Sequence, residues 1–326
     1  MGEALEIAKA LVEPGTKLME LVGRAVGTMY APHHERKMAD AEAYRIKTIS
    51  EAVKESSFLP VTYNKDGISI SAEDANELYQ RAEMREQYQK IQEQRNIENV
   101  IEHARCEMID APCVENTPVD DDWINRLLKN AKEVNSETMQ FIWGKILAGE
   151  VSKPGSFSLR TLEVIRNLSK EEAKAFQEIL PFVVNQSRKK VLLGSQELNQ
   201  KYGISYLKLE LLSECGLLGS ENGNIFNMDI IGEDSSGFYN KSRIMYFSDP
   251  AKKNTKITYG GYTLTKAAVE LETILEYTPN TDYFLDLAEE FYHRSSNLLK
   301  ICVHKVNCIS EDNINYEDEP LSVFGE

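Results

Sequence analysis

The chain has 326 residues, of which 42% are hydrophobic and 27% are charged, and its formal net charge is −15. This composition is typical of a folded globular protein and excludes general disorder. The negative charge repels phosphate backbones and anionic lipids, so contact with nucleic acid or a membrane requires a local basic patch.

The cysteine content and the hydropathy predict a cytoplasmic protein. The five cysteines are odd in number and include no CxxC pair, which favours reduced thiols in a bacterial-type cytoplasm. We find no run of about 18 apolar residues and no signal-peptide pattern, so we predict neither a transmembrane helix nor secretion.

A short amphipathic helix is predicted over residues 3–12, and a second one over Thr16–Tyr30, because apolar residues recur there at helical spacing. Its apolar face consists of Leu18, Leu21, Val22, Ala25, Val26 and Met29. Three partners are open for this face: its own domain, a second copy of the chain, or a membrane surface. A third helix is predicted over residues 34–55, and a loop or small hairpin over residues 57–71.

A long charged helix is predicted from about Ser71 to Asp110. Apolar residues are spaced four and three apart near both ends of this stretch, but its middle is polar and changes phase. This pattern indicates an interrupted coiled coil. Together with the apolar seams of the preceding helices, it predicts self-association into a homo-oligomer.

The segment from Asp120 to Arg160 holds both tryptophans, Trp123 and Trp143, on two consecutive amphipathic helices. Asp120 is placed to cap the first of them. A further helix is predicted over Lys170–Val184, preceded by a capping box of Ser169 and Glu172. We therefore predict that the two tryptophans lie inside a helical core.

The last third of the chain changes character. Two short helices, the second ended by Gly216, precede strand-like runs at Asn224–Ile231, Arg243–Ser248 and Thr255–Tyr259. A helix then begins near Thr265. This order is typical of a winged-helix-like module, and the acidic residues 311–326 are predicted to form a mobile tail.

The sequence thus predicts a mostly α protein in four parts. These are an N-terminal helical arm with an interrupted coiled coil over residues 1–110, a central helical bundle over residues 111–185, a winged-helix-like α+β domain over residues 186–310, and an acidic mobile tail over residues 311–326.

Motifs for catalysis are missing from the sequence. The string GKILAGE contains Gly144 and Lys145 but lacks the GxxxxGK[ST] spacing of a phosphate loop, and it belongs inside a helix. Neither HExxH, nor Cys/His ligand spacing, nor GxSxG occurs. We therefore predict no catalytic residue, no cofactor and no metal site, and a chain that is not an enzyme.

Two basic runs are candidates for contact with nucleic acid. They consist of Arg188, Lys189, Lys190, Lys252, Lys253 and Lys256. The candidate recognition helix, Ser205–Cys215, fits this role less well, because it carries Lys208 beside Glu210 and Glu214, whereas base edges are usually read by Arg, Lys, Asn or Gln. Another protein is therefore the favoured partner and nucleic acid is the alternative.

The middle segment DDDWINRLLKNAKEVNSETMQFIWGKILAGEVSKPGSFSLR and the later LLSECGLLG and TLTKAAVELETI resemble a bacterial family of unknown function. The motif around Trp143 is also similar to that of the abortive infection alpha proteins, which are associated with phage resistance. The resemblance implies a bacterial or phage-related cytoplasmic setting and a helical core, and it brings no established catalytic residue.

Three hypotheses for the function follow. The first is a non-enzymatic interaction protein in antiviral defence that self-associates through its N-terminal helices. The alternatives are a winged-helix nucleic-acid-binding regulator and a membrane-surface effector that uses the Thr16–Tyr30 helix.

Overall fold

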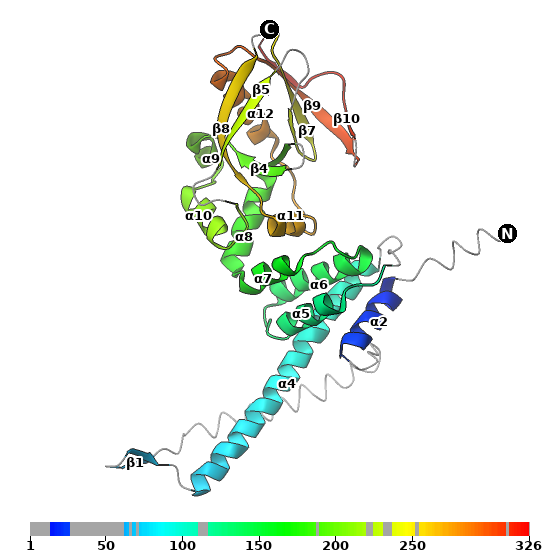
Figure 1. The fold of residues 1–326 in the computed structure, drawn as a ribbon, viewed down its shortest axis with the longest axis vertical. Helices are drawn as coiled ribbons and strands as arrows, with labels where there is room; N and C mark the ends of the chain where they lie inside the picture. Colours follow the sequence, from blue (N-terminus) through cyan, green and yellow to red (C-terminus); the bar gives the residue numbers. More distant parts are fainter. Residues whose placement is uncertain are drawn as a thin grey trace, which may run out of the picture. The chain divides into compact units, whose positions relative to one another are not determined.

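The computed structural model divides into two compact units, with the boundary after Ser156 (Figure 1). The sequence predicted boundaries near residues 110 and 185 instead. The difference arises because the helices after residue 120 pack on the long helix before them, whereas the helix that begins at Leu159 packs with the helix over Lys266–Glu272. The structure describes residues 14–26, 62–64, 67–69, 72–109, 117–186, 189–219, 224–230, 237–251, 254–310 and 313–325.

The N-terminal unit contains four described helices and a small hairpin. These are α2 (Pro14–Val26), β1 (Thr62–Asn64), β2 (Gly67–Ser69), α4 (Ala72–Met108), α5 (Asp121–Ala131) and α6 (Glu137–Ser152). Only the C-terminal half of α4 packs against α2, α5 and α6, with Val100, Ile101 and Ala104 buried. The long helix is confirmed as predicted, and of the loop or small hairpin predicted over residues 57–71 the structure forms the hairpin.

The tryptophan-containing helices form the core of this unit. Asp120 accepts a hydrogen bond from the Trp123 backbone N–H at 2.9 Å and so caps α5. Trp123 and Trp143 are both buried, which confirms the helical core predicted around them.

Helices α4 and α6 approach each other closely at Gly144. A Cβ atom at this position would lie 2.5 Å from the Cβ of His103, 3.0 Å from the backbone nitrogen of Ala104 and 3.1 Å from the carbonyl oxygen of Val100. Only glycine fits here without moving one helix, so the first glycine of the GKILAGE string has a packing role inside α6.

Six helices and a short 3₁₀ turn are described in the C-terminal unit. They are α7 (Leu159–Asn167), α8 (Lys170–Ile179), η1 (Leu180–Phe182), α9 (Gln196–Lys201), α10 (Tyr206–Glu214), α11 (Lys266–Glu272) and α12 (Thr281–Arg294). The capping box of Ser169 and Glu172 is confirmed, since each side chain bonds the backbone N–H of the other. Gly216 ends α10 with a φ of +80°, as predicted.

The prediction of a mostly α protein is wrong, because the C-terminal unit is built on a nine-stranded antiparallel sheet. The strand order is β10-β9-β7-β6-β3-β4-β8-β5, and β11 also pairs with β9. The strands are β3 (Val183–Gln186), β4 (Lys189–Leu193), β5 (Asn224–Ile230), β6 (Gly237–Tyr239), β7 (Arg243–Ser248), β8 (Thr255–Thr263), β9 (Lys300–Ile309), β10 (Ile314–Tyr316) and β11 (Ser322–Phe324).

A separate winged-helix-like domain is therefore not formed. Helices α9 and α10 do lie between β4 and β5 in sequence, and β8 pairs with both of these strands. The same strands, however, continue into a sheet with six others. The prediction of a mobile tail over residues 311–326 is also wrong. Strands β10 and β11 pair with β9 along the edge opposite to β7.

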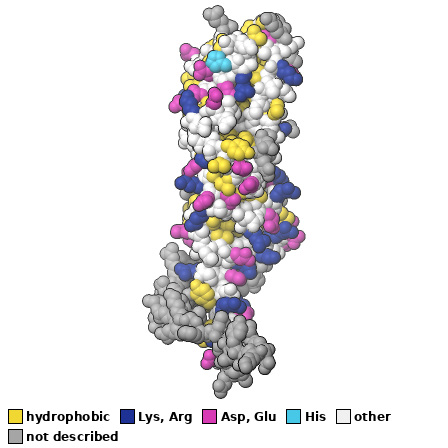
Figure 2. All heavy atoms as spheres, turned by 90° about the vertical axis from the view of Figure 1, so that its left-hand side faces the viewer, with side chains coloured by type: hydrophobic (Ala, Val, Ile, Leu, Met, Phe, Trp, Pro, Cys, Tyr) yellow, Lys and Arg dark blue, Asp and Glu magenta, His cyan; other side chains and the backbone are white. Residues whose placement is uncertain are grey.

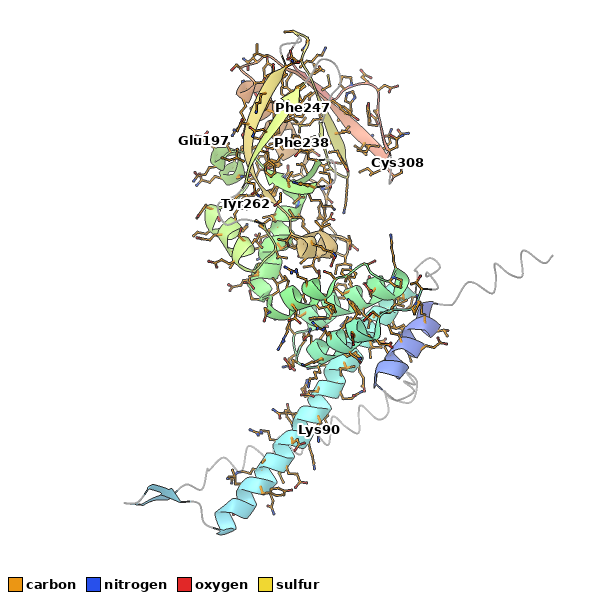
Figure 3. The ribbon with its side chains drawn as sticks, in the orientation of Figure 1. Lys90, Glu197, Phe238, Phe247, Tyr262 and Cys308 are labelled. Atoms are coloured by element: carbon orange, nitrogen blue, oxygen red, sulfur yellow. The ribbon has the colours of Figure 1, made fainter. Side chains whose placement is uncertain are left out.

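The core of the C-terminal unit is aromatic. Helix α12 packs against β7, β8, β9 and β11. The ring of Phe291 on α12 lies 5.2 Å from that of Phe238, 5.4 Å from that of Phe247 and 5.3 Å from that of Tyr259, measured between centroids. Figure 3 shows Phe238 and Phe247 inside the curve of the sheet. Packing of α12 on these rings joins the central strands to β8.

Candidate functional site

The basic residues predicted to contact nucleic acid do not form one patch among the residues that the structure describes. Three of the six lie outside the described residues: Arg188, Lys252 and Lys253. Lys189 and Lys256 are exposed at opposite ends of the β4–β8 pair, and Lys256 is paired in register with Asp229 of β5. Lys190 forms an ion pair with Glu272 of α11. Two of the three described cations thus face a carboxylate.

Glu272 is the centre of an ionic cluster. Its side chain is only 3% exposed, and it accepts hydrogen bonds from Lys190 Nζ and the Tyr277 hydroxyl. Lys241 Nζ lies 3.4 Å from the same carboxylate and 4.1 Å from the centroid of the Tyr277 ring. The cluster therefore joins β4, the turn between β6 and β7, and the segment after α11.

Charge governs the protonation of this cluster. Burial raises the pKa of Glu272, but the hydrogen bonds from Lys190 and Tyr277 and the charges of Lys190 and Lys241 outweigh burial, so the pKa lies below 4.5. For Tyr277, burial and the adjacent carboxylate both raise the pKa. At neutral pH the carboxylate is ionised and holds Lys190, which is then engaged within the fold.

Two further carboxylates of the C-terminal unit stabilise the starts of distant helices. Glu270 accepts hydrogen bonds from the Ser158 backbone N–H at 2.7 Å and from the Thr161 hydroxyl at the start of α7. Glu290 accepts from both the backbone N–H and the hydroxyl of Ser195 at the start of α9. These carboxylates satisfy free N–H groups of helix ends, which gives them a structural role.

The apolar face predicted for self-association or membrane contact lies inside the N-terminal unit. Leu18, Leu21 and Val22 are buried, and α2 packs against α4, α5 and α6. The side chains of Ala25 and Val26, and the whole of Met29, lie outside the described residues. Of the three partners left open by the sequence, the domain itself covers the three described side chains, so neither a second copy nor a membrane reaches them in the folded unit.

Helix α10, the candidate recognition helix, exposes apolar side chains at its N-terminal end. Tyr206 is 51% exposed and Leu207 is 72% exposed. Lys208, the basic residue of this helix, donates to Glu178 at 2.7 Å and to the carbonyl oxygen of Gly203 at 3.2 Å. The exposed end of α10 is thus suited to an apolar partner, and its lysine is already engaged.

The apolar side chains of α10 continue onto the neighbouring strands. Burial raises the pKa of Tyr262 on β8, and the electrostatic interaction with Tyr206 adds to the rise, so the hydroxyl groups of these two residues are within electrostatic range of each other. Ile225 of β5 is 78% exposed and pairs with Gly260, which shares a sheet face with Tyr262. We call Tyr206, Leu207, Ile225 and Tyr262 the α10–β5 surface.

The α10–β5 surface can be located in the figures. Figure 3 places Tyr262 beside α10 at the lower end of β8. Figure 2 looks onto this side of the C-terminal unit, and hydrophobic side chains gather at the height of α10 among acidic and basic ones. An exposed apolar group with a charged rim is typical of a protein-binding surface.

A polar groove of about 450 Å³ lies between α4 and the turn that joins α5 to α6. It is lined by Gln92, Arg95, Asn96, Asn99, Glu102, His103, Asn135, Glu137 and Gln140. Asn96 is buried at its base and donates to the carbonyl oxygen of Lys132 at 2.8 Å, while its Oδ1 accepts from Gln140 at 3.1 Å. Gln140 also donates to the carbonyl oxygen of Val134 at 2.7 Å. These amides hold the α5–α6 turn on α4.

Replacing Asn96 with alanine is expected to lower the free energy of unfolding by about 2 kcal/mol, because buried partners lose their hydrogen bonds. Chemical denaturation monitored by tryptophan fluorescence measures this loss, since both tryptophans belong to the N-terminal unit. Asn99→Ala is the matched control at an exposed position of the same groove, where Asn99 donates to Gln140 Oε1 at 3.1 Å, and we expect it to cost about 0.5 kcal/mol. Equal losses for the two variants would contradict the structural role of Asn96.

The described cysteines are unpaired thiols, and Cys113 lies outside the described residues. Cys106 and Cys308 are exposed, and Cys308 lies towards the end of β9 (Figure 3). Burial raises the pKa of Cys215 to about 11, so this thiol stays protonated at neutral pH. Within the described ranges, no group of three or more His, Cys, Asp or Glu side chains could hold a metal ion. None of the described helices is long and apolar enough to span a bilayer.

Comparison with known proteins identifies the family of the chain. Residues 80–288 match a family described as protein of unknown function, DUF2806. The match covers more than half of the chain, so the chain belongs to this family, as the resemblance to a family of unknown function predicted. It begins in the N-terminal quarter of α4, ends within α12 and includes residues of both units. No curated protein and no solved structure matches the chain.

Proposed function

We propose that this member of the DUF2806 family is a non-enzymatic interaction protein, and that its C-terminal unit binds another protein through the α10–β5 surface. One observation carries the proposal: Tyr206, Leu207 and Ile225 are apolar or aromatic and yet exposed. Tyr206 interacts electrostatically with Tyr262, and Ile225 shares a sheet face with Tyr262. Aromatic side chains in such a position commonly dominate the binding energy of protein interfaces.

Charge supports a protein partner over nucleic acid. A nucleic-acid-binding surface needs free cations near the phosphates, yet Lys190 and Lys208 are paired with carboxylates within the fold. The net charge of −15 also disfavours nucleic acid, because it repels the phosphate backbone. The α10–β5 surface can bury apolar area against a protein without opposing this charge.

The contacts of three carboxylates in the C-terminal unit, two of them buried, support a non-catalytic role. Glu270 and Glu290 bond helix starts, and Glu272 is held by two lysines and a tyrosine. A general acid or base must instead be free to exchange its proton with a substrate.

Affinity capture of the full chain from its source cells, followed by quantitative mass spectrometry, tests the proposed surface. We expect Leu207→Asp to reduce recovery of a bound protein at least tenfold, because a carboxylate would lie in the apolar contact. Leu298→Asp, at another exposed leucine of the same unit, is the matched control and should retain the partner. Recovery that is the same for all three proteins would contradict the proposal.

A gel-shift assay at low salt separates this proposal from the nucleic-acid alternative. We expect no shift of duplex DNA or single-stranded RNA by the wild-type chain. A shift that is lost in Lys189→Glu and Lys256→Glu would instead favour a nucleic-acid-binding regulator, because such binding depends on counterion release by cations.

We further propose antiviral defence as the cellular setting. Its support is the similarity of the motif around Trp143 to that of the abortive infection alpha proteins. Plating a phage panel on cells with and without the gene measures this role. Defence predicts a reduced plating efficiency for at least one phage in expressing cells, and that reduction should be lost in Leu207→Asp. Equal plating throughout would contradict the proposed setting.

A further inference from the structure

Strand β5 forms one end of the nine-stranded sheet. It pairs with β8 through seven consecutive register positions from Asn224 to Ile230. In the part of the chain that the structure describes, no strand lies along its other edge. Alternate residues of an end strand present their N–H and C=O groups at the open edge, where they can form hydrogen bonds with the backbone of another strand.

Apart from the charged side chain of Asp229, the edge of β5 lacks the features that usually protect an end strand from pairing. The strand has seven residues, NIFNMDI, with unbroken register and without proline, glycine or lysine. The opposite end of the sheet differs: β10 has three residues, and its register with β9 shifts between Asn315 and Tyr316. Short strands and irregular register are common protective features, so the open pairing edge belongs to β5.

We propose that β5 pairs with β5 of a second copy of this chain, antiparallel and about a two-fold axis through Met228. The arrangement of side chains on β5 supports a second copy of the chain as the partner. Asn227 and Asp229 are exposed on one face, and Met228 and Ile230 are buried on the other. The axis places Asn227 opposite Asp229 of the second copy, twice by symmetry, and Phe226 opposite Ile230.

The polar pair in this arrangement is complementary. The Oδ1 atom of Asn227 accepts a hydrogen bond from the Thr258 hydroxyl at 2.8 Å. Its amide group therefore remains the donor for a carboxylate across the axis. On the other face, apolar side chains meet apolar side chains and extend the aromatic core of each unit.

Other symmetric registers fit less well. An axis through Asn227 would place Asp229 opposite Ile225, and an axis through Phe226 would place Asn227 opposite Ile225. Each of these registers places a polar side chain opposite an aliphatic one. The axis through Met228 creates no such pair between residues of the two β5 strands. Side-chain complementarity therefore selects one register.

Sedimentation equilibrium of the full chain over a range of concentrations tests the dimer. We expect a monomer–dimer equilibrium that Asn227→Asp weakens by about tenfold or more, because two pairs of carboxylates would then face each other. The exchange Asn227→Asp with Asp229→Asn should restore the dimer. Asn315→Asp, the same substitution on β10, is the matched control and should leave it unchanged. Circular dichroism confirms that each variant is folded.

Cross-linking tests the register directly. A mixture of Asn227→Cys and Asp229→Cys chains should form disulfide-linked dimers faster than either variant alone, above the background that the native exposed Cys106 and Cys308 give in the wild type. A chain that stays monomeric at every concentration, a dimer that Asn227→Asp does not weaken, or equal cross-linking by single variants and mixture would overturn the proposal. Leu207→Asp should not change the mass, so failure of the dimer and failure of partner binding are distinguishable.

Discussion

Replacing Gly144 with valine is expected to lower the free energy of unfolding of the N-terminal unit by about 3 kcal/mol. The added side chain would start 2.5 Å from the Cβ of His103 and 3.0 Å from the backbone of Ala104. These atoms belong to α4 and cannot rotate away, so α4 and α6 must separate and lose buried contact along their length.

Urea denaturation followed by tryptophan fluorescence measures this effect, because Trp123 and Trp143 both lie in the N-terminal unit. Gly15→Ala in α2 is the control, since a Cβ there meets nothing within 4 Å. We expect that variant to be neutral or slightly stabilising, because alanine favours helix. A stability for Gly144→Val equal to that of the wild type would show that α6 can move away without loss.

Replacing Glu272 with alanine is expected to destabilise the C-terminal unit by about 3 kcal/mol at neutral pH. Removing one partner of a largely buried ion pair leaves the other charge without compensation. Here Lys190 loses its counter-charge, and Tyr277 loses its acceptor. Lys241 is more exposed and can turn to water. The expected loss of unfolding free energy is therefore near the lower end of the range of about 3–5 kcal/mol that is typical of buried ion pairs.

Scanning calorimetry of the full chain detects this loss in the C-terminal unit. Glu289→Ala on α12 is the control, since that carboxylate is exposed and lies 3.8 Å from His293. We expect it to change stability by about 0.5 kcal/mol or less. Similar losses for the two variants would contradict the central role of Glu272.

The stability that Glu272 confers should also depend on pH. Its pKa in the folded chain is lower than in the unfolded chain, so the unfolded chain binds more protons at acidic pH. The contribution of Glu272 to stability is therefore complete above pH 4.5, the ordinary pKa of a glutamate. It is lost as the pH falls through the lower pKa that Glu272 has in the folded chain. The stability gap between wild type and Glu272→Gln should be constant near neutrality and shrink below about pH 4.5. A stability difference that increased at acidic pH would contradict the lowered pKa of Glu272.

Local signals in the sequence were sufficient for many helix boundaries. Asp120, Ser169 and Gly216 act within one turn of their own helices, so their roles could be predicted without knowledge of the fold. The tryptophan-containing core is predictable for a similar reason, because helical periodicity identifies a buried face.

The sheet was harder to predict because its pairings are not local. The predicted helix Lys170–Val184 continued past Pro181 into β3, and β4 contributes only five residues. Each of these strands is defined by partners distant in sequence, such as β4 by β8. A short apolar run does not indicate which strand will lie beside it.

The candidate site was predicted only in part for the same reason. The apolar face of α2 was recognised, but its periodicity could not identify the element that covers Leu18. Lys190 was recognised as a basic residue, but its partner Glu272 lies 82 positions away. The exposure of Leu207 and Ile225 depends on the final packing and leaves no signal in the local sequence.

The pairing of β10 and β11 with β9 has a practical consequence for expression of this protein. Deleting residues 313–325 would uncover one side of a ten-residue strand, and strands exposed in this way tend to recruit other chains. A shortened protein would therefore be prone to precipitate during purification. Affinity tags belong on flexible spacers beyond Phe324, and protease trimming of the acidic end would remove part of the folded domain.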